Sequence, residues 1–264
     1  MAIKDLLIQI DAFTASETQL AYALGIAEAH GAHTIGVAHV PAGVASLRDD
    51  AQAALSAFAR AGEQRGLTME TRLTECAPGD LAGLLALQAR HTDMTVIGQP
   101  ATDGSQQCRL QTAVYEELLF HSGRPVLVVP WAGRPKPVPQ TAIVAWDASS
   151  TAARALADAL PILRQAGKTV ILVATDGQST TLGADPGTDI AQHLARHDVD
   201  VELRRIPLDP DTKTADLLLS QVADLGADLM VMGGYHHSRM REYILGGVTR
   251  TIMKTMTVPI LMSH

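Results

Sequence analysis

The sequence of 264 residues has few aromatic side chains and few cysteines. With three Phe, two Trp and four Tyr, its hydrophobic cores must be built from Ala, Val, Ile, Leu and Met. The two cysteines, Cys76 and Cys108, form no C-x-x-C motif and cannot provide a disulfide framework. Neither has an evident cluster of cations beside it beyond Arg109, so incidental cysteines are favoured over redox sensors.

Several other signals are missing. No stretch approaches the roughly 18 apolar residues of a membrane span, and the start MAIKDLLIQIDAF is too short in its apolar run and too acidic for a signal peptide. There is no G-x-x-x-x-G-K-[ST] loop, no G-x-G-x-x-G after a first strand, no G-x-S-x-G and no H-E-x-x-H. The sequence therefore predicts a cytoplasmic protein without an evident metal requirement or membrane partner.

The net charge is negative and is unevenly distributed between the two halves of the sequence. The net charge of −7 argues against a nucleic-acid partner, because phosphate backbones need a basic surface. Residues 1–131 carry 8 Lys and Arg against 14 Asp and Glu, a net −6, whereas residues 132–264 carry 13 against 14, a net −1. One cationic stretch, residues 239–254, has four basic residues and a single acidic one, Glu242.

The chain repeats itself. LLIQIDA (6–12) resembles AIVAWDA (142–148), MTVIGQP (94–100) resembles LMVMGGY (229–235), and RPVLVVP (124–130) resembles VPILM (258–262). The landmark pairs are Asp11 and Asp147, Gly98 and Gly233, and Pro125 and Pro259, with offsets of 136, 135 and 134 residues. Such constant spacing indicates a tandem duplication.

Each half alternates apolar runs with helix-period segments. The predicted strands are 5–11, 33–40, 68–74, 93–98 and 125–130, then 141–147, 169–175, 200–205, 228–233 and 258–262. The predicted helices are 16–30, 47–65, 79–91 and 111–122, then 150–166, 187–197, 212–226 and 246–256. Continuously apolar strands that alternate with helices predict two tandem α/β domains, doubly wound and Rossmann-like, each a five-stranded parallel sheet with about four helices.

The segment WAGRPKPVPQ (131–140) contains three prolines, which favour an extended linker. We therefore expect domains at 1–131 and 141–264, with a linker at 132–140. The last strand of each half is short and apolar, and would be prone to pairing at a sheet edge. The two last strands either pair with each other within one chain or lie inside their own sheets. A homodimer is equally compatible with the sequence.

The stretch MGGYHHSRMREYILGGVTRTIM (232–253) leaves a strand at Gly233, crosses a loop and enters a helix at Gly246-Gly247. Glycines at a strand end and the amides of a helix start suit a phosphate, with Arg239 and Arg241 as countercharges. In the alternative interpretation, Gly233-Gly234 only ends a strand and Gly246-Gly247 only caps a helix. For the adjacent pair His236-His237, a solvated loop is favoured over a metal site.

Asp147 ends the first strand of the second half and suits a ribose hydroxyl. Because Ala-Ser-Ser-Thr follows it, Asp147 equally fits the role of a turn or N-cap residue.

VAWDAS together with MGGYHHSRMREYILGGVTRTIMKTMTVPIL resembles the universal stress protein family, with the first half as a divergent second copy. Nucleotide-binding members of that family carry G-x-x-G, nine residues, then G-[ST]. Gly233 and Gly246 match, whereas His236 replaces the second glycine and Gly247 the final Ser or Thr. In the first half Asp11 and Gly98 are kept, but Thr112 and Ala113 replace the last pair, so we expect that domain to have lost phosphate binding.

The resemblance implies an adenine nucleotide site, with ATP as the cofactor. Asp147 matches the carboxylate that contacts ribose or adenine, and the backbone of Ala174 matches the position that pairs with adenine. The full set of expected nucleotide-binding residues is Ala145, Trp146, Asp147, Ala174, Met232, Gly233, His236, Gly246, Gly247, Val248 and Thr249.

Three functions follow from these observations. The first is a cytoplasmic stress-response protein that binds ATP or another adenine nucleotide in its C-terminal domain, with a regulatory or protective role and no defined catalytic reaction. The second is a protein-interaction module of the same fold without nucleotide binding, in which His236 and Gly247 mark a lost site. The third is a weak ATP hydrolase, for which Asp147 and His236 are the nominated residues.

Overall fold

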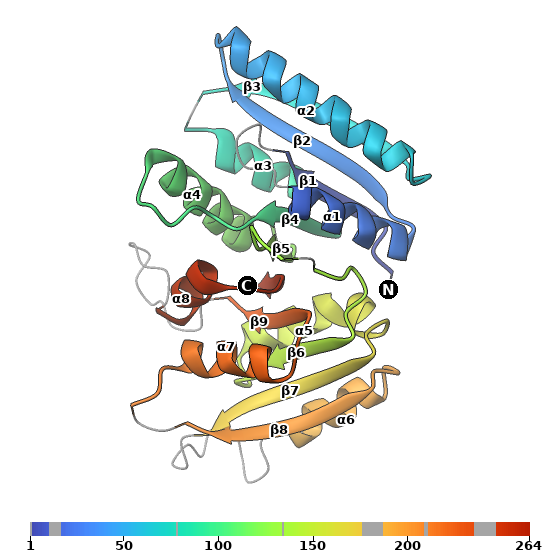
Figure 1. Ribbon diagram of the computed structural model, residues 1–264, viewed down its shortest axis with the longest axis vertical. Coiled ribbons are helices and arrows are strands. Elements are labelled where there is room, and N and C mark those ends of the chain that lie inside the picture. Colours follow the sequence, from blue (N-terminus) through green and yellow to red (C-terminus); the bar gives the residue numbers. More distant parts are fainter. Residues whose placement is uncertain are drawn as a thin grey trace. The chain divides into compact units, whose positions relative to one another are not determined.

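A computed structural model describes residues 2–10, 17–77, 79–133, 135–175, 187–208, 211–234 and 247–264. The chain divides into two compact units, Met1–Pro137 (unit 1) and Val138–His264 (unit 2). Each unit has its own strands and helices, which Figure 1 colours from blue to green in unit 1 and from green to red in unit 2.

The described residues of each unit contain five strands and four helices. Unit 1 consists of β1 (Asp5–Gln9), α1 (Glu17–His30), β2 (His33–Pro41), α2 (Ala45–Glu63), β3 (Met69–Cys76), α3 (Leu81–Ala89), β4 (Met94–Gly98), α4 (Gln106–His121) and β5 (Val126–Val129). Unit 2 consists of β6 (Thr141–Ala145), α5 (Ser150–Leu163), β7 (Lys168–Thr175), α6 (Thr188–Ala195), β8 (Val201–Pro207), α7 (Thr214–Asp224), β9 (Leu229–Gly233), α8 (Gly247–Thr255) and β10 (Ile260–Ser263).

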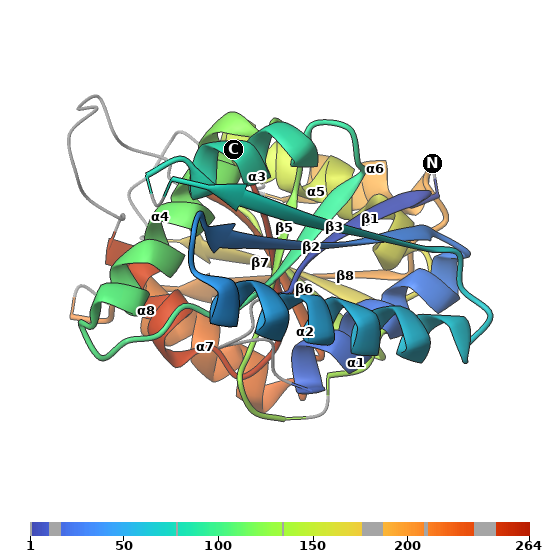
Figure 2. The ribbon, with the colours of Figure 1, turned by 90° about the horizontal axis from the view of Figure 1, so that it is seen from above.

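The strand order is the same in both units. It is β3-β2-β1-β4-β5 in unit 1 and, written from the equivalent end, β8-β7-β6-β9-β10 in unit 2. The strand pairs within each unit are parallel. In unit 1, α1 and α2 lie on one side of the strands and α3 on the other (Figure 2). The predicted fold class, two tandem doubly wound α/β domains, is confirmed.

The central strands are apolar because both of their faces are covered. In β1, Leu6, Leu7 and Ile8 are fully buried, as are Leu229, Met230 and Val231 in β9. A strand that is covered on one face only would alternate apolar and polar side chains. The continuous apolar runs that predicted these strands therefore follow from the three-layer packing.

A glycine sets how closely α2 approaches the sheet of unit 1. A Cβ atom added to Gly36 in β2 would lie 2.7 Å from a ring carbon of Phe58, which is 1% exposed. The ring of Phe58 therefore packs directly on the backbone of β2. Because neighbouring side chains of a strand point to opposite faces, Gly36 also identifies the residues of β2 that face α2.

The largest error among the predicted boundaries is at the start of α4. The sequence predicts a helix over 111–122, whereas α4 begins at Gln106. The side-chain oxygen of Ser105 accepts a hydrogen bond from the backbone N–H of Cys108 at 3.0 Å, and Asp103 Oδ1 accepts one from the N–H of Ser105 at 2.9 Å. This side-chain cap satisfies the first turn of a helix that has no apolar repeat before residue 110.

The last strands occupy the ends of their own sheets. β5 pairs with β4 and ends the strand order of unit 1, and β10 pairs with β9 and ends that of unit 2. The alternative in which the last strand lies inside its own sheet is therefore wrong. Pairing of the two last strands with each other stays a prediction.

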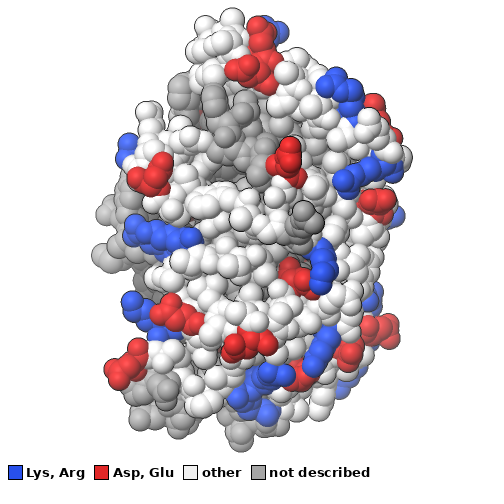
Figure 3. All heavy atoms as spheres, in the orientation of Figure 1, with Lys and Arg blue, Asp and Glu red and all other residues white. Residues whose placement is uncertain are grey.

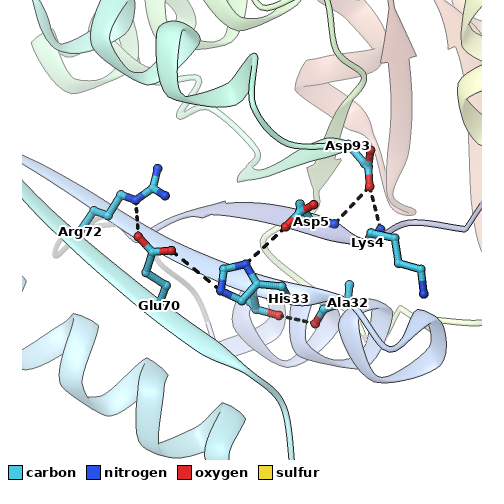
Figure 4. Close-up of polar contacts among 8 residues, drawn as sticks. Lys4, Asp5, Ala32, His33, Glu70, Arg72 and Asp93 are labelled. Atoms are coloured by element: carbon cyan, nitrogen blue, oxygen red, sulfur yellow. Dashed lines mark hydrogen bonds and ion pairs between the residues drawn. The ribbon is translucent and has the colours of Figure 1, made fainter.

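The amino ends of the strands carry a matching polar cluster in each unit. In unit 1, His33 lies between Asp5 and Glu70, with Nδ1 3.4 Å from Asp5 Oδ1 and Nε2 3.9 Å from Glu70 Oε2, and Arg72 Nε donates to Glu70 Oε1 at 2.7 Å (Figure 4). The corresponding ion pairs in unit 2 join Lys168 and Arg204 to Glu202. The Arg72 hydrogen bond lowers the pKa of Glu70.

An aspartate in front of the fourth strand fixes the start of the first strand in both units. Asp93 Oδ2 accepts from the N–H groups of Lys4 at 2.7 Å and Asp5 at 3.1 Å (Figure 4). Asp228 Oδ2 accepts from Gln140 at 2.8 Å and Thr141 at 3.4 Å. The duplication thus extends to individual hydrogen bonds that the sequence motifs do not include.

The surface charges are mixed in sign. On the described part of the face drawn in Figure 3, acidic and basic side chains lie interspersed. None of the helices in the described ranges is both long and apolar enough to cross a membrane.

Candidate functional site

The strand order of unit 2 reverses beside its first strand. β6 pairs with β7 on one side and with β9 on the other. The chain therefore runs from β6 to β7 and β8 on one side, and then crosses to β9 and β10 on the other side of β6. Open parallel sheets bind ligands outside the carboxyl ends of their strands at such a point. The carboxyl edge at β6, β7 and β9 is therefore the candidate site.

Asp147 follows β6 at this edge and is held by a turn. Its Oδ1 accepts a hydrogen bond from the N–H of Ser149 at 3.0 Å, and the hydroxyl oxygen of Ser149 accepts one from the N–H of Ala152 at 3.0 Å. Ala148, between them, has a left-handed φ of 60°. Asp147 is exposed to solvent. Asp147 thus has the turn role expected as the alternative to a ligand role, whereas the N-cap of α5 is Ser149 and not Asp147. The carboxylate of Asp147 remains accessible.

Gly233, at the end of β9, lies against the first turn of α5. A Cβ atom added to Gly233 would lie 2.6 Å from both the hydroxyl oxygen of Thr151 and the amide nitrogen of Ala152. No side chain fits in that space, so packing of α5 alone requires glycine here. The sequence motif assigned this glycine to phosphate approach, and the structure gives it a packing role as well.

The first turn of α8 lies at the same edge, because a helix that follows β9 and precedes the parallel strand β10 must start there. The helix begins at Gly247, where an added Cβ atom would meet no described heavy atom within 4 Å. Gly247 and Val248 are exposed, whereas Thr249 is 3% exposed. The N–H groups of a first helical turn have no partner within the helix and attract anions.

The remaining predicted residues are divided. Ala145, Trp146 and Ala174 are half-buried at the carboxyl ends of β6 and β7, and the N–H of Trp146 donates to the carbonyl of Leu172 at 2.9 Å. Met232 is 5% exposed and belongs to the core. His236 and Gly246 lie outside the described residues, as do Asp11, Arg239, Arg241 and His237.

The equivalent edge of unit 1 is built differently. Thr112, at the position of Gly247, lies inside α4 and not at its start, and its hydroxyl donates to the carbonyl of Cys108 at 2.8 Å. The N-terminus of α4 instead binds the side chain of Ser105. The backbone N–H of Ala101, in the preceding loop, donates to Gln111 Oε1 at 2.8 Å. Thr112 and Ala113 thus offer no free helix start.

Neither the two cysteines nor any group of three or more potential metal-ligating side chains among the described residues forms a second candidate site. Cys76 is buried, and its burial and the nearby Asp80 raise the pKa of its thiol. Cys108 is half-exposed in the first turn of α4. Among the described residues, no three or more His, Cys, Asp or Glu side chains are arranged to hold a metal ion.

Comparisons with known proteins agree with this fold. Residues 140–264 match the model of the universal stress protein family. A universal stress protein from Archaeoglobus fulgidus DSM 4304 has 16% sequence identity and a TM-score of 0.73, over 98% of this chain and 95% of that one. A functionally unknown protein from Pseudomonas aeruginosa PAO1 has 16% identity and a TM-score of 0.65, over 99% of this chain and 92% of that one. A search of curated proteins finds no match.

Proposed function

Because residues 140–264 belong to the universal stress protein family, we propose that unit 2 binds an adenine nucleotide, ATP, at the carboxyl edge of β6, β7 and β9. The same premise supports a regulatory or protective role in the response to stress, in the cytoplasm. The phosphates lie at the first turn of α8, the ribose at Asp147, and the adenine beside Ala174.

Three features of the edge support this arrangement. The carboxylate of Asp147 is exposed and is held by the Ser149 turn, so it can accept hydrogen bonds from ribose hydroxyls with little loss of freedom. Ala174 is a small residue at the end of β7, where a planar base can approach the backbone. The start of α8 provides amides and a favourable dipole for phosphate.

The single observation that carries the proposal is the difference between the two helix starts. The described part of α8 starts at Gly247, where an added Cβ atom would meet no described heavy atom within 4 Å, whereas the equivalent Thr112 lies inside α4. Thr112 therefore cannot provide the amides of a first helical turn, which is the role that we propose for Gly247 in unit 2.

An ATP titration tests the proposal. The chain has two tryptophans, so Trp131→Phe leaves Trp146, next to Asp147, as the only one. We expect a saturable change in its fluorescence below millimolar ATP. Asp147→Asn removes a charged acceptor and is expected to weaken binding about tenfold, or ~1.4 kcal/mol.

The matched control is Asp103→Asn, which removes one negative charge from the corresponding edge of unit 1. ATP affinity is expected to stay unchanged in this variant. The absence of any saturable response in a folded protein, checked by circular dichroism, would contradict nucleotide binding. Equal weakening by the two variants would show that net charge, and not the Asp147 site, controls binding.

A further inference from the structure

The C-terminal end of α6 carries two histidines one helical turn apart. His193 lies in the last turn of α6, and His197 lies in the turn that follows the helix. Their ring centroids are 4.6 Å apart, and the two ring planes make an angle of 61°. His193 is exposed and His197 is half-buried. The two imidazoles therefore lie side by side on a face of the helix that solvent can reach.

Hydrogen bonds and packing fix the backbone beneath this pair. The N–H of His197 donates to the carbonyl of Leu194 at 2.9 Å, and the N–H of Val199 donates to the same carbonyl at 3.2 Å. Arg164 Nε donates to the carbonyl of His197 at 2.8 Å. Leu194, which lies between the two histidines, is fully buried. The histidines are therefore attached to an anchored turn, so little backbone freedom would be lost when a ligand joins their rings.

The separation of the two rings matches that of two imidazoles on one metal ion. A coordinating nitrogen lies about 2.0–2.1 Å from the metal and about 1.1 Å from the centre of its own ring. With an angle of about 90–109° between the two nitrogens at the metal, the ring centroids are about 4.5–5.2 Å apart. The observed 4.6 Å lies within this range. Two histidines four residues apart on one helix face are also the spacing that binds Zn²⁺ in H-E-x-x-H proteins.

The chemistry of the pair selects a class of ion. In the described part of the chain, the ring nitrogens of His193 and His197 form no hydrogen bond or ion pair, so they are open to a ligand. Imidazole nitrogen suits Zn²⁺, Cu²⁺ and Ni²⁺, whereas Mg²⁺ and Ca²⁺ take oxygen ligands. The carbonyl groups at the C-terminus of a helix add a negative potential that attracts a cation.

The equivalent helix end of unit 1 lacks these groups. Both helices are followed by a left-handed residue, Gly66 after α2 and Asp198 after α6, with φ of 73° and 61°. In both, the next residue donates its N–H to the carbonyl four residues before the left-handed one, at 3.1 Å and 3.2 Å. The residues of unit 2 and their counterparts in unit 1 are His193 and Ala61, His197 and Arg65, and Asp198 and Gly66. Unit 2 thus has two imidazoles and a carboxylate where unit 1 has a methyl group, a guanidinium and no side chain, and a cation meets less repulsion there.

We propose that His193 and His197 form a surface site for one divalent transition metal ion of the zinc, copper or nickel class. One nitrogen of each ring coordinates the ion. The other positions of the ion are left to water, because no three potential ligand side chains of the described residues are arranged around a metal ion. The charge of Asp198 acts on the ion through space. The site lies on α6 and does not depend on the nucleotide site proposed at the carboxyl edge.

Calorimetric titration of the full-length, metal-free protein with Zn²⁺, in the absence of nucleotide, tests the site. We expect saturable binding with a micromolar dissociation constant, tighter binding of Cu²⁺, and no binding of Mg²⁺. His193→Ala and His197→Ala should each weaken Zn²⁺ binding about tenfold or more. In NMR spectra, the imidazole signals that disappear in these two variants should be those that Zn²⁺ shifts in the unmodified protein.

The matched control keeps both histidines and changes only their spacing. Gln192→His combined with His193→Gln leaves the composition unchanged but puts the histidines five residues apart, on different parts of the helix surface. This variant should lose Zn²⁺ binding as His193→Ala does. His121→Ala, which removes an exposed histidine from the last turn of α4, should leave binding unchanged.

Undiminished binding by the respaced variant would overturn the proposal. So would weakening by His121→Ala as large as that by His193→Ala, or the absence of saturable Zn²⁺ binding by the folded protein. All of the substituted side chains are at least half-exposed, and circular dichroism checks that each variant is folded. ATP binding reported by Trp146 is measured separately, so failure of either site is recognised by itself.

Discussion

Units 1 and 2 share their strand order and differ at their carboxyl edges. Both fix the first strand with an aspartate, Asp93 or Asp228, and both place a basic residue (His33 or Lys168), a glutamate and an arginine at the amino ends of their strands. At the carboxyl edge, the described residues of unit 2 include small residues at the strand ends and an exposed Gly247 at the first described position of α8, whereas unit 1 has a helix start capped by Ser105 and polar residues. The common architecture therefore lies at one edge and the chemical divergence at the other.

The largest effect is expected from Gly233→Ala. The new Cβ would overlap Thr151 and Ala152, and relief of the clash must shift α5 or β9. We expect the free energy of unfolding of unit 2 to fall by about 2–3 kcal/mol, measured by urea denaturation with Trp146 as the only tryptophan. Unit 1, followed with Trp131, should be unaffected.

Gly247→Ala is the control for this variant, because its Cβ enters open space. Its unfolding free energy should change by less than about 1 kcal/mol. A loss below that value for Gly233→Ala would contradict close packing of α5 on β9.

The helix caps should give the next largest effect, and a symmetrical one. Ser149 caps α5 in unit 2 and Ser105 caps α4 in unit 1, each accepting a backbone N–H at 3.0 Å. Substitution of either by Ala should destabilise its own unit by about 1 kcal/mol, followed by urea denaturation with the tryptophan of that unit. Loss of stability in the other unit would contradict independent capping.

A smaller effect, confined to unit 1, is expected from pH. Burial lowers the pKa of His39, so the unfolded chain binds a proton more readily than the folded one. Unit 1 should therefore lose stability as the pH falls below about 6.5, the ordinary histidine value, towards the lowered folded value. His39→Ala should reduce this loss without abolishing it, because burial also lowers the pKa of His30.

The pH dependence is measured as the urea midpoint of unit 1 between pH 7.5 and 5. An unchanged pH slope in His39→Ala would show that His39 does not resist protonation in the folded state. The equivalent residue of unit 2 is alanine, so the slope of that unit should not change with the substitution.

The smallest effect is expected at the amino edge. Glu70→Gln removes the acceptor shared by His33 and Arg72, all of which are at least 32% exposed. Exposed ion pairs contribute little, so unit 1 should lose less than about 1 kcal/mol, and still less in 1 M salt. The equivalent Glu202→Gln should act in the same direction on unit 2. A loss that persists in high salt would mean that the cluster contributes through packing.

Much of the architecture could be predicted from the sequence. The continuously apolar strands and the offset of about 135 residues between the halves come from the same physical cause, two copies of a sheet covered on both faces. The start of α4 could not be predicted in this way, because hydrogen bonds to Ser105 and Asp103 determine it and no apolar repeat marks it.

The candidate site was only partly accessible to sequence reasoning. The motif located Asp147, Gly233 and Gly247 at one edge, but it did not show that Gly233 is required for packing on α5. His193 and His197 belong to no recognised motif. Their relation became visible only when the structure placed both rings side by side at the end of α6 and matched that helix end to the end of α2.

Because Gly233 packs against α5, the presence of this glycine does not by itself indicate that a domain binds a ligand. A library of variants selected for solubility alone is expected to return glycine at this position, even from clones that bind no ligand. Its persistence therefore records how a helix meets a strand. Unit 1 also has a glycine, Gly98, at the corresponding strand end, while Thr112 lies within α4. The ligand-binding capacity of a duplicated copy is therefore better judged from the residue at the position of Gly247 than from the glycine at the end of the fourth strand.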